Sequence, residues 1–189
     1  MAVRCFVAVD LEDPDLLDAL GRFQDGLRGV GADLKCVERE NIHLTMRFLG
    51  DVGEGVLEDL QGLISGVNFS PFGMGLRGVG TFPNLRRPRV IWVGITRGVD
   101  ELKGIFDRLE SGLVGMGFRP ERRGFSPHIT IARVRSGRNR DRLIEEVIAL
   151  EGRDFGVFEV GHVKLKKSVL TPRGPIYTDL ALSGRVEGA

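Results

Sequence analysis

Ile42-His43-Leu44-Thr45-Met46 and Pro127-His128-Ile129-Thr130-Ile131 repeat one pattern: a histidine and a threonine two residues apart, with apolar residues between and after them. Successive side chains of a β-strand point to opposite faces, so each histidine shares a face with its threonine while the apolar residues share the other face. A buried strand does not need two polar side chains on one face, whereas a site that binds a phosphate does. Two of the chain's three histidines lie in this pattern. We therefore predict fold and function from it.

The residue types of the repeated pattern suit acid–base chemistry at phosphorus. Histidine titrates near neutral pH, so one of two histidines can accept a proton from an attacking oxygen while the other donates a proton to a leaving oxygen. Each threonine hydroxyl can donate a hydrogen bond to a non-bridging phosphate oxygen. Alternate residues of a strand are about 7 Å apart, so two such strands across a groove can bind one phosphodiester from both sides. The candidate catalytic residues are His43, Thr45, His128 and Thr130.

This chemistry requires no metal ion, and the sequence shows no metal-binding motif. There is no H-E-x-x-H, no cysteine–histidine cluster and no acidic set at EF-hand spacing. The chain also lacks the Gly-Lys pair of a Walker-type phosphate loop. We expect neither a metal nor another cofactor.

Elsewhere the sequence alternates single helices with pairs of strands. Apolar residues at helical spacing predict helices over about 14–29, 56–64, 100–116 and 140–150, the first with Asp13 as its N-cap and Pro14 as its first residue. Runs rich in branched and aromatic residues predict strands over 3–10, 34–37, 42–49, 90–95, 128–134, 155–169 and 176–182, and another within 69–80. The run over 90–95 has few polar residues and is expected to be buried on both faces. The last two strands are joined by a turn at 171–175. The order predicts an α+β fold, a single domain over 1–189 with two similar lobes.

Bulk composition excludes several classes of protein. A hydrophobic fraction of 42% argues against disorder, and a net charge of +1 excludes a global attraction to nucleic acid. Cationic charge is local: residues 119–142 hold eight arginines against Glu121 and Asp141. No apolar run approaches the length of a membrane span, and the first residues do not resemble a signal peptide. Cys5 and Cys36 form no recognisable motif, so free thiols in the cytoplasm are expected.

The extended segments HLTMRFLG (43–50) and FSPHITIAR (125–133), with 88–92 and 168–177, carry a family resemblance that covers nearly the whole chain in order. They resemble the two-histidine phosphoesterase superfamily and, within it, the LigT-like RNA 2′,3′-cyclic phosphodiesterases, historically called 2′-5′ RNA ligases. The resemblance implies a bilobal fold in which two antiparallel sheets face a central groove, with helices packed on their outer faces. It also implies metal-independent opening of a 2′,3′-cyclic phosphate, on an RNA end or nucleotide, to a 2′-phosphate. We expect a monomer with no membrane partner.

Roles within the site follow from the resemblance, because strand geometry alone does not orient the substrate. It implies that His43 is the proton donor to the departing 3′ oxygen and that His128 is the proton acceptor from water. Phe48 and Arg133, each five residues after its histidine, match family residues that contact the nucleotide. Strict alternation puts an odd offset on the opposite face, so their involvement requires a β-bulge or a strand end nearby.

Two other functions compete with the phosphodiesterase. A 2′-5′ RNA ligase would use the same histidines in reverse, but hydrolysis is favoured in water unless two RNA ends are held together. A non-catalytic nucleotide- or RNA-binding module would use the histidines only as phosphate ligands, a task for which arginine is better suited. Trp92 is expected in the core, and Phe125 and Tyr177 are alternative base-stacking residues.

Overall fold

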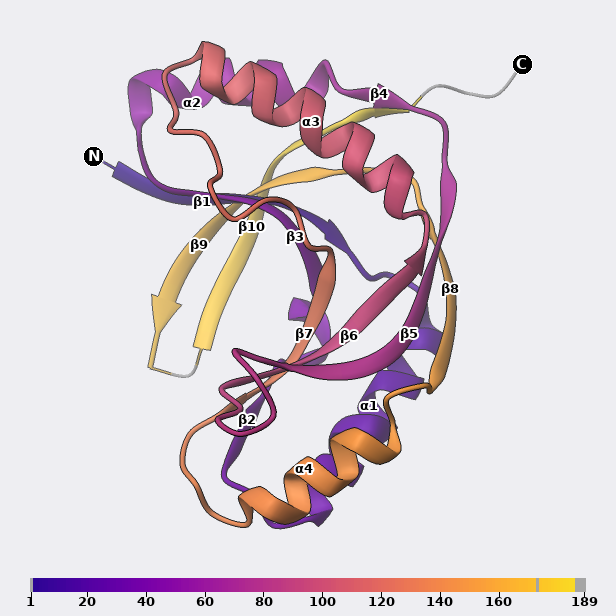
Figure 1. The fold of residues 1–189 in the computed structure, drawn as a ribbon. Coiled ribbons are helices and arrows are strands. Elements are labelled where there is room, and N and C mark those ends of the chain that lie inside the picture. The colour runs from indigo at the N-terminus through magenta and orange to yellow at the C-terminus, as the bar shows by residue number, and fades with distance from the viewer. Residues whose placement is uncertain (1, 173, 186–189) are drawn as a thin grey trace.

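A computed structural model describes residues 2–172 and 174–185 of the chain (Figure 1). Its helices are α1 (Pro14–Gly29), α2 (Glu54–Ser65), α3 (Val99–Gly115) and α4 (Arg140–Ala149), with a short 3-10 helix η1 (Arg39–Asn41). Its strands are β1 (Ala2–Asp10), β2 (Leu34–Cys36), β3 (His43–Gly53), β4 (Asn68–Phe69), β5 (Phe72–Phe82), β6 (Val90–Arg97), β7 (His128–Val134), β8 (Asp154–Val160), β9 (Lys164–Thr171), β10 (Gly174–Leu182) and β11 (Gly184–Arg185). Arg173, in the predicted turn at 171–175, lies outside the described residues.

Nine of these strands form one sheet in which the two histidine strands are neighbours. The order is β10-β9-β1-β3-β7-β6-β5-β8, with β2 added beside β7, and the neighbouring strands are antiparallel. The halves meet where Leu44 of β3 pairs with Ile129 of β7. The α+β class is therefore confirmed, and the two antiparallel sheets of the prediction are the two halves of one continuous sheet.

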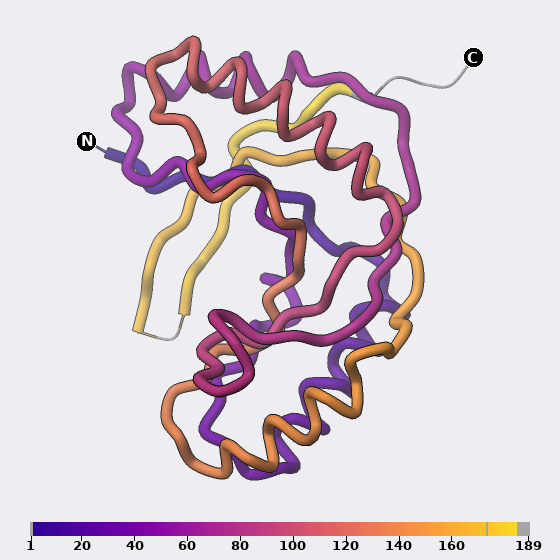
Figure 2. The backbone as a smooth tube through the Cα atoms, in the orientation of Figure 1, coloured from indigo at the N-terminus to yellow at the C-terminus, as the bar shows by residue number. Residues whose placement is uncertain are grey.

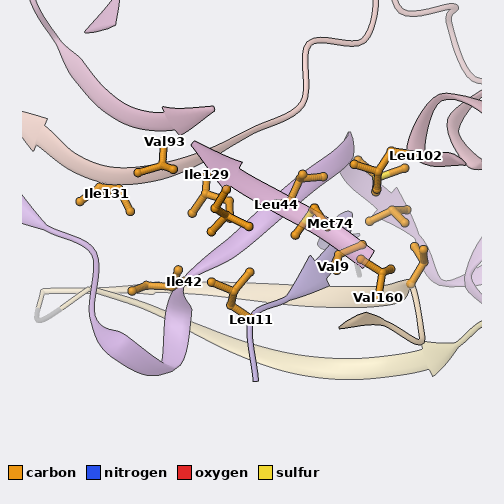
Figure 3. Close-up of a cluster of buried hydrophobic side chains, with 14 of the residues drawn as sticks. Val9, Leu11, Ile42, Leu44, Met74, Val93, Leu102, Ile129, Ile131 and Val160 are labelled. Atoms are coloured by element: carbon orange, nitrogen blue, oxygen red, sulfur yellow. The ribbon is translucent and has the colours of Figure 1, made fainter. Parts of the chain in front are cut away.

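The helices lie in two pairs at opposite ends of the molecule (Figure 1). Helix α2 packs against β3, β9 and β10 and against α3, whereas α1 packs against β7 and β8, and α4 packs against β5. One buried cluster runs beneath both halves of the sheet, and Figure 3 shows Leu44 and Ile129 within it. No helix in the described ranges is long and apolar enough to cross a bilayer.

Helix α1 forms as its sequence predicts. The Asp13 side chain accepts a hydrogen bond of 2.9 Å from the backbone N–H of Leu16, and Pro14 occupies the first turn, where its missing N–H costs nothing. The apolar stripe, including Leu20, is buried. Burial of this stripe, rather than helix propensity, is the main source of the helix's stability.

Two strand predictions are wrong. The expected strand over 155–169 is two strands, β8 and β9, which lie in different halves of the sheet: β8 pairs with β5, and β9 with β1 and β10. Their apolar patterns run on from one to the other, so local periodicity did not mark the crossing at Gly161 and His162. The run over 90–95 is not buried on both faces, because only Ile91 and Val93 are fully buried and Trp92 faces the side that carries the histidines.

Candidate active site

The two motifs lie side by side on one face of the sheet. Leu44 and Ile129 pair in antiparallel register, and both side chains are fully buried. Continuing this register by one residue in each direction sets the histidine of each strand opposite the threonine of the other. Neighbours of a core-facing residue point the other way, so four side chains share the face away from the core: His43, Thr45, His128 and Thr130. The repeated motif forms one cluster around a local twofold axis.

Both imidazoles are held by the backbone two residues before them. Nδ1 of His43 lies 2.7 Å from the carbonyl oxygen of Asn41, and Nδ1 of His128 lies 2.7 Å from that of Ser126. A carbonyl oxygen only accepts, so each neutral ring carries its proton on Nδ1 and leaves Nε2 to exchange a proton with a substrate. At His43, Nε2 lies 3.1 Å from Oγ1 of Thr45, whose hydroxyl donates to the neutral ring.

A β-bulge follows each motif at the same place. In β3 the extra residue is Met46, which the register with β1 skips. In β7 it is Ile131, which the register with β6 skips. Each bulge lies three residues after its histidine and brings the fifth residue back to the histidine's face. Of the two conditions set for Phe48 and Arg133, a bulge or a strand end, the structure shows a bulge at both motifs, and the two residues line the same cavity as His43.

The bulge in β7 is held by a side chain that sequence reasoning missed. The amide of Gln24, buried in α1, donates to the carbonyl oxygens of Val37 (2.8 Å) and Ile131 (3.1 Å). The backbone N–H of Val37 also donates to the Ile131 carbonyl, at 2.8 Å. The available signal was positional: Gln24 lies four residues after Leu20, on the buried stripe of the helix, where a polar side chain needs a partner.

A cavity of about 550 Å³ lies over the motif face. Five of the predicted site residues line it: His43, Thr45, Phe48, Thr130 and Arg133. One wall comes from β10 and is formed by Pro175, Ile176 and Tyr177. Figure 2 shows the hairpin of β9 and β10 projecting from the body of the molecule.

His128 does not line this cavity. Its ring packs edge-on against Phe82, with centroids 4.9 Å apart, and lies 6.3 Å from Trp92. Its Nε2 makes no hydrogen bond within residues 2–172 and 174–185. The register with Leu44 opposite Ile129 nevertheless places His128 beside Thr45 and His43 beside Thr130.

His43 is enclosed by aromatic rings. Its centroid lies 5.2 Å from Phe6 and 5.5 Å from Tyr177, the latter edge-on. Burial, the largest influence, lowers the pKa of His43 below its ordinary value and outweighs the Asn41 carbonyl and the Asp10 carboxylate, which raise it. Burial raises the pKa of Tyr177, so its phenol keeps its proton at neutral pH.

An ion-pair network flanks His43 on β1, β9 and β10. Asp10, the ladder partner of His43, accepts hydrogen bonds from Lys164 (3.0 Å) and Lys166 (2.5 Å). Lys166 also donates to Asp179 at 2.7 Å, and its side chain is only 8% exposed. Both ammonium groups are therefore paired within the network, which links β1, β9 and β10. No group of three or more His, Cys, Asp or Glu side chains in the described part of the chain could hold a metal ion.

The structure places the two candidate base-stacking residues, Phe125 and Tyr177, in different surroundings. Phe125 stacks on Phe106 of α3, with centroids 4.7 Å apart and planes at 11°, so it packs in the body of the protein. Tyr177 instead lines the cavity. Trp92 is half-buried on the histidine side of the sheet, near His128 rather than inside the core.

The LigT-like phosphoesterase family matches residues 9–92 and again residues 93–177, one match for each histidine motif. The chain belongs to the LigT-like phosphoesterase family. Among curated relatives of this LigT-like chain is the RNA 2′,3′-cyclic phosphodiesterase of Methanothermobacter thermautotrophicus, which is 44% identical over 95% of this chain and 97% of that protein. The protein of the same name from Aeropyrum pernix is 40% identical over 90% of this chain and 100% of that one.

Solved structures share the fold of this LigT-like protein. A Thermus thermophilus protein matches with a TM-score of 0.79 and 29% identity, over 95% of this chain and 96% of that one. LigT of E. coli in complex with ATP matches with a TM-score of 0.74 and 25% identity, over 96% of this chain and 97% of that one.

Proposed function

We propose that this protein hydrolyses 2′,3′-cyclic phosphates at RNA ends to 2′-phosphates without a metal ion. The main support for the proposal is the pairing of Leu44 with Ile129, because that register places two histidines and two threonines on one face of the sheet. The curated relatives named RNA 2′,3′-cyclic phosphodiesterase support the same reaction. A nucleotide ligand also agrees with the ATP complex of E. coli LigT.

The histidines supply the proton transfers. A water oxygen attacks phosphorus while His128 Nε2 accepts its proton, and the bond from phosphorus to the 3′ oxygen breaks as His43 Nε2 donates a proton to that oxygen. The product is a 2′-phosphate with a free 3′ hydroxyl. Solvent then returns each ring to its starting protonation state. The anchored Nδ1 atoms keep both Nε2 atoms available throughout.

The lowered pKa of His43 makes its role as donor depend on the substrate. Burial favours the neutral ring in the free protein, and the cations Lys166 and Arg133 add to this effect. A bound anionic phosphate reverses the balance, because a negative charge nearby stabilises the imidazolium. His43 therefore becomes protonated as the substrate binds.

The remaining site residues orient the nucleotide. Hydroxyls of Thr45 and Thr130 donate to the non-bridging phosphate oxygens, where negative charge gathers in the transition state. The Arg133 guanidinium binds a phosphate oxygen, and the ring of Phe48, 67% exposed at the cavity, packs on the sugar or base.

An activity assay on a defined RNA substrate tests the proposal. An oligoribonucleotide ending in a 2′,3′-cyclic phosphate is incubated with the protein in excess EDTA, and the end group is identified. We expect a 2′-phosphate, with turnover lowered about 10²- to 10⁴-fold in His43→Ala and in His128→Ala. His162→Ala is the matched control, because His162 lies between β8 and β9, outside both motifs, where its Nδ1 is 3.1 Å from the Ser183 carbonyl oxygen. Turnover lost in EDTA, or kept in both motif variants, refutes the mechanism.

The same experiment separates the alternatives. Adding a second RNA with a 5′ hydroxyl gives a 2′-5′ joined product if the protein is a ligase. A non-catalytic binding module gives no turnover in any variant, while its affinity for RNA survives the substitution of a histidine.

Three finer expectations belong to this proposal. Two pseudo-symmetric lobes are supported by the double family match over 9–92 and 93–177. A cytoplasmic location is supported by the free, buried thiols of Cys5 and Cys36. A monomer agrees with a site whose histidines both come from one chain, and sedimentation measurements test it.

A further inference from the structure

Cationic side chains continue along the motif face beyond the β7 bulge. Leu34 of β2 pairs with Val134 of β7, and both pack against the core. Their neighbours point the other way, toward the cavity side: Lys35 pairs with Arg133 and lines the cavity with it. The backbone N–H of Arg135 donates to the carbonyl of Asp33 at 2.9 Å, so the ladder extends one residue further and Arg135 follows Arg133 on the same face.

The two arginines of this row are available for a ligand. Both are exposed, and neither guanidinium has a hydrogen bond or ion pair within residues 2–172 and 174–185. Arg47 shows the contrast, because its guanidinium is used by Glu110, Glu121 and backbone carbonyls. A guanidinium without a protein partner is suited to a phosphate, which it binds through paired N–H donors.

Charge and apolar surface divide the cavity into two sides. The β10 wall is formed by an aromatic ring and two apolar side chains, which suit a base. Glu38 and Glu40 line the cavity near the start of β3 and repel phosphates there. A strand attached to the reacting nucleotide is therefore directed along β7, toward Arg133 and Arg135.

The spacing of this row suits a polynucleotide. Alternate residues of a strand are about 7 Å apart, which is comparable to one nucleotide step of extended single-stranded RNA. The cyclic phosphate is at the 3′ end, so the rest of an RNA leaves through the 5′ oxygen of the reacting nucleotide. With Arg133 beside the reacting end, Arg135 lies one step further along the strand.

We propose that Arg135 binds the phosphodiester that precedes the reacting cyclic phosphate, and that the protein prefers an RNA strand to a free cyclic mononucleotide. This inference rests on the proposed function. It adds a subsite for a second phosphate and a reason for the preference.

The test compares two substrates in three proteins. The ratio of kcat/KM for a cyclic-phosphate oligoribonucleotide to that for a 2′,3′-cyclic mononucleotide is measured in the wild type, Arg135→Gln and Arg138→Gln. The control removes the same charge from an exposed arginine in the turn before α4, off the strand. We expect the ratio to fall about fivefold in Arg135→Gln, with the salt slope of log(kcat/KM) for RNA shallower by about 0.7, and no change in Arg138→Gln.

A binding measurement distinguishes a failure of this inference from a failure of the proposed function. Affinity for an oligoribonucleotide ending in a 2′-phosphate, followed by fluorescence anisotropy, should fall in Arg135→Gln and not in Arg138→Gln. An unchanged ratio and affinity in Arg135→Gln, or equal losses in both variants, overturns the Arg135 subsite. If the wild type turns over neither substrate, the proposed function fails, and the anisotropy measurement still decides whether Arg135 binds RNA.

Discussion

Gly80 is the position at which one added methyl group should disturb the site without touching it. Gly80 of β5 pairs with Trp92 of β6, and the indole lies over the glycine. A Cβ at residue 80 would be 2.3 Å from Cζ2 and 2.5 Å from Cη2 of that ring. The indole must retreat by about 1 Å to reach an ordinary contact of 3.4 Å. It then moves against the rings of Phe82 and His128, whose centroids lie 5.3 Å and 6.3 Å from that of the indole.

The size of the effect follows from this overlap. Forcing a methyl group into a packed contact costs about 1–3 kcal/mol of unfolding free energy. A displacement of about 1 Å at a reacting group can lower turnover as much as about a hundredfold. We therefore expect Gly80→Ala to lose about 2 kcal/mol of stability and at least tenfold in kcat/KM for a cyclic mononucleotide.

The assay has a built-in reporter, because Trp92 is the chain's one tryptophan. Urea unfolding gives the stability, and the emission maximum of the native protein reports a shift of the indole. Gly104→Ala is the matched control: Gly104 is exposed in α3, and beyond its chain neighbours and the nearby helix backbone no described atom lies within 4 Å of the place that an added methyl group would take, so the helix should gain about 0.5–1 kcal/mol. Native emission, stability and activity unchanged in Gly80→Ala would refute the reasoning.

Three further substitutions or titrations test other parts of the site. The imidazole of His43 should titrate below its ordinary value of 6.5 by NMR, and at higher pH once a 2′-nucleotide is bound. Since the unfolded chain binds this proton more readily than the fold does, the free energy of unfolding should fall as the pH drops below about 6.5. Gln24→Met should cost about 1–3 kcal/mol and raise KM more than it lowers kcat, because the bulge loses its side-chain donor. Arg47→Met should cost about 3 kcal/mol, because it leaves the nearly buried Glu110 carboxylate without its guanidinium partner.

Each of these has an outcome that contradicts it. A His43 resonance that titrates above 6.5 in the free protein would remove burial as the dominant influence on this ring. Equal stability of Gln24→Met and the wild type would show that the bulge holds without the amide. For Arg47→Met, an exposed ion pair serves as control: Lys103→Met, which breaks the pair with Asp107, should change stability by less than about 1 kcal/mol. A loss in Arg47→Met no larger than that of Lys103→Met would contradict the prediction.

The local sequence pattern was enough to predict most of the helices and strands. Helix α1 begins after Asp13 and ends at Gly29, as predicted, because capping and apolar spacing are properties of adjacent residues. Strand β7 spans His128–Val134, again as predicted. The pattern failed over 155–169, where two strands follow each other in sequence but pair in different halves of the sheet.

The sequence also predicted which side chains of each motif share one face of a strand. Alternation along a strand places His43 with Thr45 and His128 with Thr130 whatever the strands pair with. Phe48 and Arg133 were assigned from the family resemblance, and their odd offset, which contradicts simple alternation, required a bulge or a strand end nearby. The structure supplies a bulge at Met46 and at Ile131.

Everything that joins the two motifs required the folded chain. The pairing of Leu44 with Ile129 connects strands that lie far apart in sequence, and Gln24 holds a bulge 107 residues away. The contact of Tyr177 with His43 and that of Phe82 with His128 also join segments that are distant in sequence. Side-chain alternation is a property of one strand, whereas register, bulges and cavity walls depend on which strand lies beside it. That choice is made by the packing of the whole core, so no single segment contains it.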